Sequence, residues 1–361
     1  MSLNIKTTKL QEMLTRAVKG VGNNKMIPIT SLLAIELKKN VLTLMTTDGT
    51  NYLNIIEHNV DGDDFYIVVE ADTISKLIAR MTCENVSLDI KENSLEVVGN
   101  GTYKIDIPLN ENGEHIVFPS GKRKDKKKGK SYKVKNSTIQ TILTSVKPSL
   151  AVTLEEPCYT GYYVGDSVVG TDSIKLASYN EKLFDSAVLV RPETMELLAV
   201  ITDDEFTVKI VDSSIECISS NCEIYTTAME GIEDYSIDAI NDLIQVEMPN
   251  TIKLSKNEVL QALDRIVLFV GAYDKNIVNV TFADRAMVVE SKATNGVESI
   301  TAVSDDEIGE FSCALDVFMF QQQVKALTSD TFELQYGDEK AIKIKDTGAD
   351  IIQILALASE E

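Results

Sequence analysis

Hydrophobic and polar residues alternate most regularly between Ile27 and Leu53. Apolar residues occupy every second position in 33–37 and in 42–44, on either side of a polar turn at 38–40, and a Thr-Asp-Gly turn follows. A period of two is typical of strands with one buried face, and an Asp-Gly pair favours a tight turn. The pattern therefore predicts a β-hairpin that leads into a third strand.

Three segments of the chain share one spacing of apolar residues, and a partial copy of the turn returns at 170–172. The matched positions are Ile5, Leu10 and Leu14, then Val134, Ile139 and Leu143, then Leu254, Val259 and Leu263. Thr8, Ser137 and Ser255 each stand three residues before Gln or Glu, as in the capping box of a helix. Each segment therefore reads as a strand residue, a cap and an amphipathic helix.

A second marker follows each of these helices. A helical pattern gives way to alternation at Thr82, Thr202 and Thr328, and the first strand residue comes four positions later in every copy. The repeat is about 120 residues long. The predicted domains are 1–120, 134–249 and 250–361, with a basic linker at 121–133.

Each repeat has two predicted helices and a larger number of predicted strands. This ratio favours an α+β fold in which both helices lie on one face of an antiparallel sheet. Three such domains in a row form a curved array with sheets on one side and six helices on the other.

Charge is distributed unevenly along a chain whose formal net charge is −21. Residues 121–135 hold nine basic and one acidic residue, whereas 136–361 hold 15 basic and 39 acidic residues. An acidic exterior is compatible with a basic surface that meets DNA. Basic residues gather on the predicted helices: Lys9, Arg16, Lys19, Lys76, Arg80, Lys147, Lys256, Arg265 and Lys325. The alternative is that they only keep the protein in solution.

Several classes of protein are disfavoured by what the sequence lacks. No apolar run reaches the ~18 to 20 residues of a membrane span, and the N-terminus has no signal-peptide pattern, so we expect a cytoplasmic protein. The five cysteines contain no CxxC, which predicts neither a zinc site nor a disulfide framework. With two histidines and no HExxH, GxSxG or phosphate-loop motif, we expect no metal, no cofactor and no catalytic site. Asp48 and Asp172 are interpreted as turn residues that accept backbone N–H groups.

The order and spacing of these segments resemble the bacterial DNA sliding clamp, the beta subunit of DNA polymerase III, over essentially the whole chain. The segments that carry the resemblance are Ile27-Pro28-Ile29, Leu44 to Gly49, Gly170-Thr171-Asp172, Ile174 to Leu176, and Gly231 with Asp234 and Tyr235. The resemblance implies that two chains close head to tail into a ring around duplex DNA, with helices lining the hole. Such a non-catalytic processivity factor needs only weak phosphate contacts, because topology retains it.

The same resemblance implies particular sites and partners. Lys25, in the loop before Pro28, is expected to reach DNA. A pocket for partner peptides is expected at Tyr159, Thr171, Ser173, Leu176, Pro249, Ile354 and Leu355. A homodimer contact is expected at Tyr103, Ile105, Ile107, Leu268 and Phe269. Partners implied are double-stranded DNA, the DNA polymerase III alpha subunit, a clamp loader and repair proteins with clamp-binding peptides. Ser173 stands where the family has glycine, and the chain end lacks the family's Met-Pro strand.

Two rival interpretations remain open. A diverged adaptor or structural protein could keep the clamp fold without encircling DNA, whereas a hydrolase has no supporting motif. The basic linker is either an auxiliary phosphate-binding loop or a solvated connection.

Overall fold

The computed structural model describes residues 1–22, 24, 26–122, 129–271, 276–292, 296–304, 306–338 and 340–358. Antiparallel sheets and α-helices make up these residues, so the predicted α+β class is confirmed. The chain divides into two compact units. Unit 1 is Met1–Ser137 with Glu193–Ala228, and unit 2 is Thr138–Pro192 with Met229–Glu361. Each unit therefore takes strands from the second sequence repeat.

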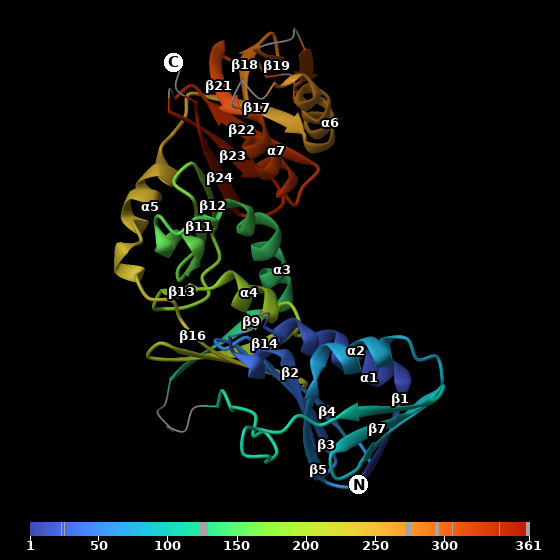
Figure 1. Ribbon diagram of the computed structural model, residues 1–361. Coiled ribbons are helices and arrows are strands. Elements are labelled where there is room, and N and C mark those ends of the chain that lie inside the picture. Colours follow the sequence, from blue (N-terminus) through green and yellow to red (C-terminus); the bar gives the residue numbers. More distant parts are fainter. Residues whose placement is uncertain are drawn as a thin grey trace. The chain divides into compact units, whose positions relative to one another are not determined.

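Unit 1 contains an eight-stranded sheet to which two sequence repeats contribute (Figure 1). Across it lie β5 (Phe65–Glu70), β2 (Leu32–Lys38), β3 (Val41–Thr47), β4 (Tyr52–His58), β16 (Cys222–Thr227), β15 (Ser214–Ile218), β14 (Glu205–Val211) and β9 (Lys130–Lys135). The hairpin and third strand predicted from the alternating pattern are β2, β3 and β4. The repeats join where β4 pairs with β16, with Ile55 opposite Cys222.

A four-stranded sheet and two neighbouring helices complete the first repeat. The sheet runs β1 (Ser2–Lys6), β6 (Asn85–Ile90), β7 (Ser94–Val98) and β8 (Thr102–Asp106). Helices α1 (Thr7–Ala17) and α2 (Ala71–Ala79) lie side by side (Figure 1), and Leu10 and Leu14 of α1 are buried as predicted. The helix α4 (Pro192–Leu198) lies mostly in the same unit, where Thr194 donates to Asn51 at 2.6 Å.

Unit 2 repeats this architecture. Its eight-stranded sheet is β13 (Val188–Val190), β10 (Tyr162–Val164), β11 (Val168–Thr171), β12 (Lys175–Tyr179), β24 (Ile351–Ala356), β23 (Ala341–Asp346), β22 (Thr331–Tyr336) and β17 (Asn250–Ser255). Its four-stranded sheet is β20 (Val297–Thr301), β19 (Ala286–Ser291), β18 (Ile277–Ala283) and β21 (Phe311–Asp316). Helices α6 (Lys256–Ile266) and α7 (Val317–Lys325) pack against each other over a core in which Phe282 stacks on Tyr336.

Three local predictions about the helices were wrong. Thr8 lies inside α1 and Ser137 inside α3 (Asn136–Ser145), so of the three predicted caps only Ser255 is confirmed, by a 3.4 Å bond from the Glu258 amide. The described residues also contain a seventh helix, α5 (Ile237–Gln245), beyond the six predicted. Short 3-10 helices span Val18–Gly20, Pro28–Ser31, Lys147–Ser149, Pro157–Thr160, Ile232–Asp234 and Val267–Phe269.

The threonine that marks each repeat has the same structural role in all three copies. It contacts a polar residue in a later turn, which fixes the end of the helix to that turn. The pairs are Thr82 with Asn100, Thr202 with Asn221, and Thr328 with Asp346. The third copy alone uses a carboxylate, and Asp346 also accepts from the Gly348 amide at 3.2 Å.

Replacing Asp346 with alanine is expected to lower the free energy of unfolding of unit 2 by about 2 kcal/mol, because Thr328 and Gly348 lose a buried, charged acceptor. Burial alone would raise the pKa of Asp346, but hydrogen bonds from Ser329, Thr328 and Gly348 hold it below the usual value. The stabilisation is therefore complete above about pH 4 and is lost as the pH falls towards the folded-state pKa.

Urea unfolding between pH 2 and 7 measures both effects. Asp346→Asn serves as the control, because asparagine fills this position in the other two repeats and keeps an acceptor. We expect this variant to stay within about 1 kcal/mol of the parent at pH 7 and to lose the acid dependence. Equal stability of Asp346→Ala and the parent at pH 7 would contradict the assignment.

Candidate functional site

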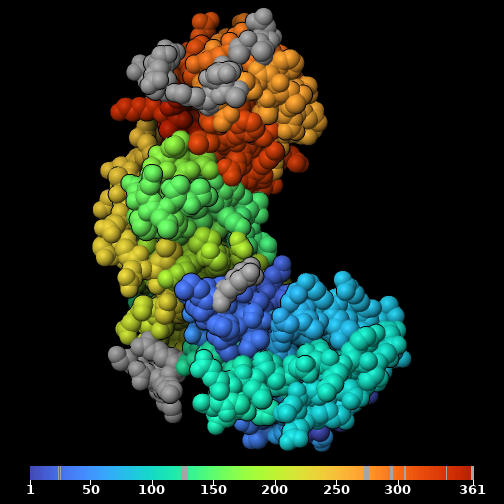
Figure 2. Space-filling model, in the orientation of Figure 1, coloured from blue at the N-terminus to red at the C-terminus, as the bar shows by residue number. Residues whose placement is uncertain are grey.

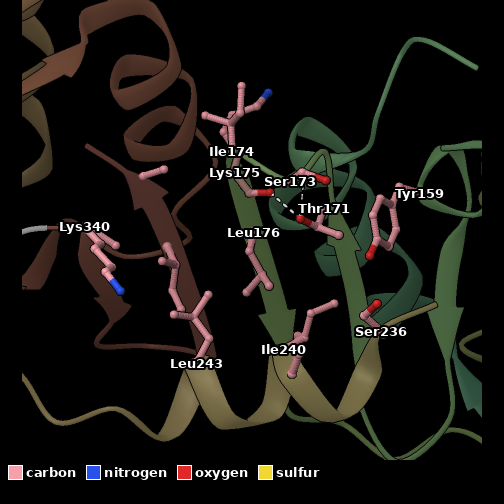
Figure 3. A pocket seen from close by; sticks show the side chains of 14 residues that line it. Tyr159, Thr171, Ser173, Ile174, Lys175, Leu176, Ser236, Ile240, Leu243 and Lys340 are labelled. Atoms are coloured by element: carbon pink, nitrogen blue, oxygen red, sulfur yellow. Dashed lines mark hydrogen bonds between the residues drawn. The ribbon is translucent and has the colours of Figure 1, made fainter. Parts of the chain in front are cut away.

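A cavity of about 330 Å³ opens on the surface of unit 2 (Figure 3). Its walls are the β11–β12 turn, one side of α5 and the ends of β23 and β24. Its lining residues are Tyr159, Thr171, Ser173, Ile174, Lys175, Leu176, Ser236, Ala239, Ile240, Leu243, Lys340, Ala341, Ile354 and Ala356. Apolar side chains dominate the floor, with Leu176 and Ile354 on adjacent paired strands. Such a groove suits the apolar side chains of a short peptide.

The turn between β11 and β12 is held by its own side chains. Asp172 Oδ1 accepts from the amides of Ile174 and Lys175 at 3.0 and 2.6 Å, and Thr171 Oγ1 donates to the Lys175 carbonyl at 2.8 Å. In unit 1, the turn at 47–51 has the corresponding bonds, with Asp48 as the acceptor. The interpretation of both aspartates as turn residues is therefore confirmed.

The two turns differ at their third residue. Gly49 has φ +98° in unit 1, whereas Ser173 has φ +71° in unit 2, a left-handed conformation that disfavours residues with a Cβ. The Ser173 hydroxyl donates to Glu156 Oε2 at 2.7 Å, which fixes the rim of the cavity to the preceding loop. A strained residue therefore stands at the cavity mouth.

Exchanging these residues is expected to change stability in opposite directions. Ser173→Gly should raise the free energy of unfolding by roughly 0.5 kcal/mol, because relief of the left-handed strain exceeds the added entropy of the unfolded chain together with the loss of the exposed hydrogen bond to Glu156. Gly49→Ser should lower it by a similar amount, since a Cβ there meets no atom closer than 3.7 Å and only the backbone is strained. Thermal melting of both variants tests this, and shifts of the same sign would contradict it.

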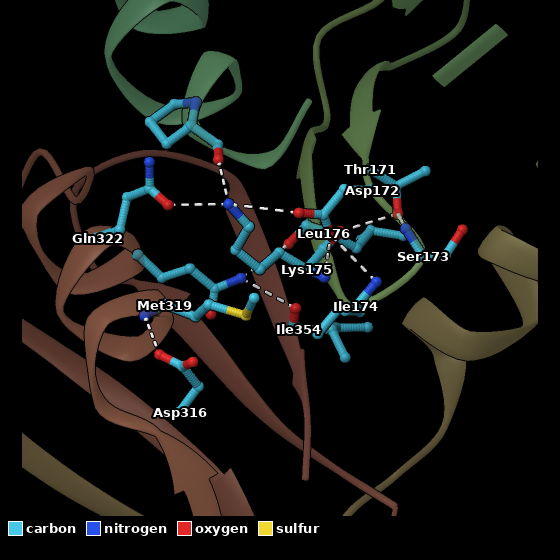
Figure 4. Close-up of polar contacts among 12 residues, drawn as sticks. Thr171, Asp172, Ser173, Ile174, Lys175, Leu176, Asp316, Met319, Gln322 and Ile354 are labelled. Atoms are coloured by element: carbon cyan, nitrogen blue, oxygen red, sulfur yellow. Dashed lines mark hydrogen bonds and ion pairs between the residues drawn. The ribbon is translucent and has the colours of Figure 1, made fainter. Parts of the chain in front are cut away.

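Lys175 fixes the cavity wall to the helix side of the sheet (Figure 4). Its buried ammonium donates to the Pro148 carbonyl at 2.7 Å and to Gln322 Oε1 at 2.8 Å, and it lies 3.4 Å from Asp172 Oδ2. These contacts join the turn to α7. Lys175 therefore serves the framework of the cavity rather than its open surface.

Three tyrosines pack together behind the cavity. Tyr159 meets Tyr235 edge to face at a centroid distance of 5.0 Å, and Tyr163 lies 5.3 Å from Tyr235 on the other side. The Tyr235 hydroxyl donates to the Val169 carbonyl at 3.3 Å, and burial raises the pKa of Tyr235. This cluster supports the start of α5, because Tyr235 immediately precedes Ser236 and the helix.

The structure brings five of the seven predicted pocket residues to this cavity: Tyr159, Thr171, Ser173, Leu176 and Ile354. Leu355 does not line it, because neighbouring strand residues face opposite sides and Leu355 packs in the core beneath. Pro249 also lies away from it, against Gly337. The α5 residues were missed, although Ile237, Ile240 and Ile244 have helical spacing.

Two of the predicted DNA-binding residues are held inside their own unit. Arg16 donates to the Val200 carbonyl at 3.0 Å and to Asn221 Oδ1 at 2.6 Å. Lys256 donates to the Leu327 carbonyl at 2.6 Å. Both side chains are half-buried, and their charged groups stabilise the fold of their own unit through these hydrogen bonds.

The other predicted cations lie at the surface or outside the described residues. Three are paired with carboxylates: Lys9 with Glu57 at 2.8 Å, Lys76 with Asp72 at 2.7 Å, and Arg265 with Glu298 at 2.6 Å. Lys19, Arg80, Lys147 and Lys325 are exposed. Of these, Lys19, Arg80 and Lys325 form no ion pair with any described carboxylate. Lys25 and linker residues 123–128 lie outside the described part of the chain.

The residues predicted for a dimer contact lie on or just after the edge strand β8 in unit 1 and in the 3-10 helix Val267–Phe269 in unit 2. Tyr103 is 42% exposed on β8, which pairs with β7 alone among the described strands, whereas Ile105 and Ile107 are buried. Leu268 is 80% and Phe269 47% exposed after α6, and Phe269 packs against Gly296 just before the edge strand β20. Each unit thus has an open strand edge beside an exposed apolar side chain.

The described residues were also compared with the requirements of a metal site, a membrane span and a reactive cysteine. They contain no group of three or more His, Cys, Asp or Glu side chains placed to hold a metal, and no helix there is long and apolar enough to cross a membrane. Cys217 and Cys222 are free and buried. Burial raises the pKa of Cys222 to about 12, which leaves its thiol unreactive at neutral pH.

Comparisons with known proteins give one consistent result. Residues 1–115 match the family model for the DNA polymerase III beta subunit, N-terminal domain. The beta sliding clamp of Lactococcus lactis is 23% identical over 349 residues, which cover 92% of this chain and 85% of that one. The beta subunit of Streptococcus pyogenes DNA polymerase superimposes over 100% of both chains with a TM-score of 0.87 and 16% identity. The Bacillus subtilis DNA polymerase sliding clamp also superimposes over 100% of both chains, with a TM-score of 0.84 and 16% identity.

These matches agree with the fold and with the predicted absence of an active site, because the beta subunit is a non-catalytic processivity subunit. Residues 1–115 are thus similar to the N-terminal domain of DNA polymerase III beta subunits, and the chain has the fold of the DNA sliding clamps over its full length.

Proposed function

We propose that this protein is a DNA sliding clamp, a homodimeric ring that encircles duplex DNA and tethers a replicative polymerase. The observation that carries the proposal is the apolar groove of unit 2, combined with the clamp fold over the full chain. The three sequence repeats would form the three domains of each half-ring. Because bacterial DNA lies in the cytoplasm, the protein acts there.

The groove would receive the clamp-binding peptides of partner proteins. Its floor is apolar and its polar rim includes Lys340 and Ser173, which could orient a peptide backbone. The partners proposed are the DNA polymerase III alpha subunit, the clamp loader and repair proteins. A clamp loader would open the ring, and the clamp itself needs no cofactor.

Two open strand edges support the proposed dimer. An antiparallel pairing of β8 from one chain with β20 from the other would satisfy unpaired backbone groups and close the ring head to tail. Tyr103 would lie at this contact, with Leu268 and Phe269 covering it.

The contacts of the basic residues support weak binding to phosphates. Lys19, Arg80 and Lys325 offer exposed ammonium or guanidinium groups, whereas Lys9, Lys76 and Arg265 would first have to exchange a carboxylate for a phosphate. Binding of this kind falls steeply with salt and reads no sequence. It suits a ring that slides, because retention then depends on closure rather than affinity.

Retention on nicked circular DNA, compared with the same DNA linearised, tests the proposal after loading. A ring stays on the circle at moderate salt and slides off the linear ends. Equal loss from both would favour the adaptor interpretation, in which the clamp fold does not encircle DNA. Neutralising the lysines from 122 to 130 tests the linker separately: unchanged loading at low salt would leave it as a solvated connection.

A further inference from the structure

Helix α5 forms one wall of the groove and packs against the rest of unit 2 along a single apolar face, made by Ile237, Ile240 and Ile244. Ile240 alone of its nine residues is fully buried, and Leu243 is 41% exposed. The groove lies on one side of the helix, and on the other side a second hollow of about 560 Å³ is lined by residues that include Asp238 and Asn241. In the space-filling view, α5 (gold) stands at the surface of unit 2 (Figure 2). Close packing therefore does not by itself set the position of this wall.

A buried lysine contacts the C-terminal end of this helix. Lys343 on β23 is only 3% exposed, and its ammonium donates to the Ile244 carbonyl at 2.8 Å and to the Val246 carbonyl. Carbonyls at the end of a helix have no partner within the helix, and a cation there interacts favourably with the helix dipole. No described carboxylate lies within ion-pair distance of Lys343. Glu247, just past the helix, also attracts this charge, but burial and the nearby Lys345 lower the pKa of Lys343 below the usual value.

Lys343 also lies next to residues that form the floor of the groove. Its strand pairs with β24, where Lys343 lies opposite the lining residue Ile354. Ala341, two residues earlier on the same face of the strand, lines the groove directly. The Lys343 side chain thus connects the end of α5 to β23, the strand beside β24 at the base of the groove.

We propose that Lys343 is the positioning residue of the groove, which sets the distance between α5 and β24 by holding the last turn of the helix. The inference rests on the proposed peptide-binding function and adds the residue that keeps the site open and shaped. Without the ammonium, the last turn of α5 would lose two charged hydrogen bonds. The helix would then move relative to the floor, while the sheet beneath keeps its register.

Hydrogen exchange of the α5 amides tests positioning without any ligand. Lys343→Met is expected to lower protection at 240–248 about tenfold, in line with the loss of a hydrogen bond to a charged group. Lys345→Met is the matched control, since it lies on the same face of the same strand and is expected to leave α5 unchanged. Lys343→Arg keeps the cation and its donors and should recover much of the protection. Unchanged protection in Lys343→Met would overturn the proposal.

Binding of a fluorescein-labelled short peptide with apolar side chains tests the consequence for the groove. We expect Kd to rise about tenfold in Lys343→Met and to stay unchanged in Lys345→Met. If the parent fails to bind any such peptide, the proposed function fails, while the exchange result still decides the role of Lys343. If α5 loosens but Kd is unchanged, the positioning role is overturned. Should Lys343→Met not fold, Lys343→Gln, which keeps a donor, replaces it.

Discussion

Changing Leu268 to glutamate is expected to convert the dimer into monomers and to abolish retention on circular DNA. Leu268 is 80% exposed in the described chain, beside the open edge of β20, so its apolar side chain is free to be covered by a partner. Losing this burial costs about 2 kcal/mol, and forcing an unpaired carboxylate into the contact costs a similar amount or more. The dimer Kd should therefore rise about a thousandfold.

Sedimentation at micromolar concentration measures this change, together with retention on nicked circles. Val152→Glu is the control, because Val152 is 97% exposed and lies on neither strand edge. The control should remain a dimer and stay on the circle. A dimeric mass for Leu268→Glu would show that the chains meet elsewhere.

Changing Leu243 to aspartate is expected to weaken peptide binding at least a hundredfold. Leu243 lines the groove from α5 and is 41% exposed, so the change leaves the folded core intact. A bound peptide would bury the new carboxylate against apolar atoms of the floor with no partner for its charge, at a cost of about 3 kcal/mol or more.

Fluorescence anisotropy with the labelled peptide measures the loss, and thermal melting confirms that the fold is kept. Ile218→Asp is the matched control, since Ile218 on β15 is exposed to a similar extent but belongs to unit 1. Its affinity should equal that of the parent. Tight binding by Leu243→Asp would place the peptide site outside this groove.

Local patterns in the sequence predicted the strands and the ends of the helices, which depend on residues that are close together in the chain. The alternation around Ile35 predicted strands, and the spacing from each threonine predicted where helices end. The same threonines meet polar partners in all three repeats, which explains why they could be recognised. Alternation also predicts that Ile354 and Leu355 face opposite sides of β24, so it could have excluded Leu355, one of the two residues that the resemblance wrongly placed in the groove.

Other features depend on partners that are distant in the sequence. Alternation tells which face of a strand is buried but not which strand lies beside it, so the pairing of β4 with β16 could not be foreseen. The helical position of Arg16 and Lys256 predicted solvent-facing cations, yet both side chains are long enough to reach carbonyls within their unit. Helix α5 was missed because each repeat was expected to hold only two helices.

The shared sheets also govern how the chain can fold while it is being synthesised. Strand β4 pairs with β3 on one edge, but its other edge has no neighbour until β16 emerges, because Ile55 pairs with Cys222. For most of this interval the nascent chain presents an unpaired strand edge, which is prone to associate with other chains. Pausing of the ribosome between these residues, or termination before residue 228, should therefore yield aggregation-prone fragments even though the complete first repeat has been made.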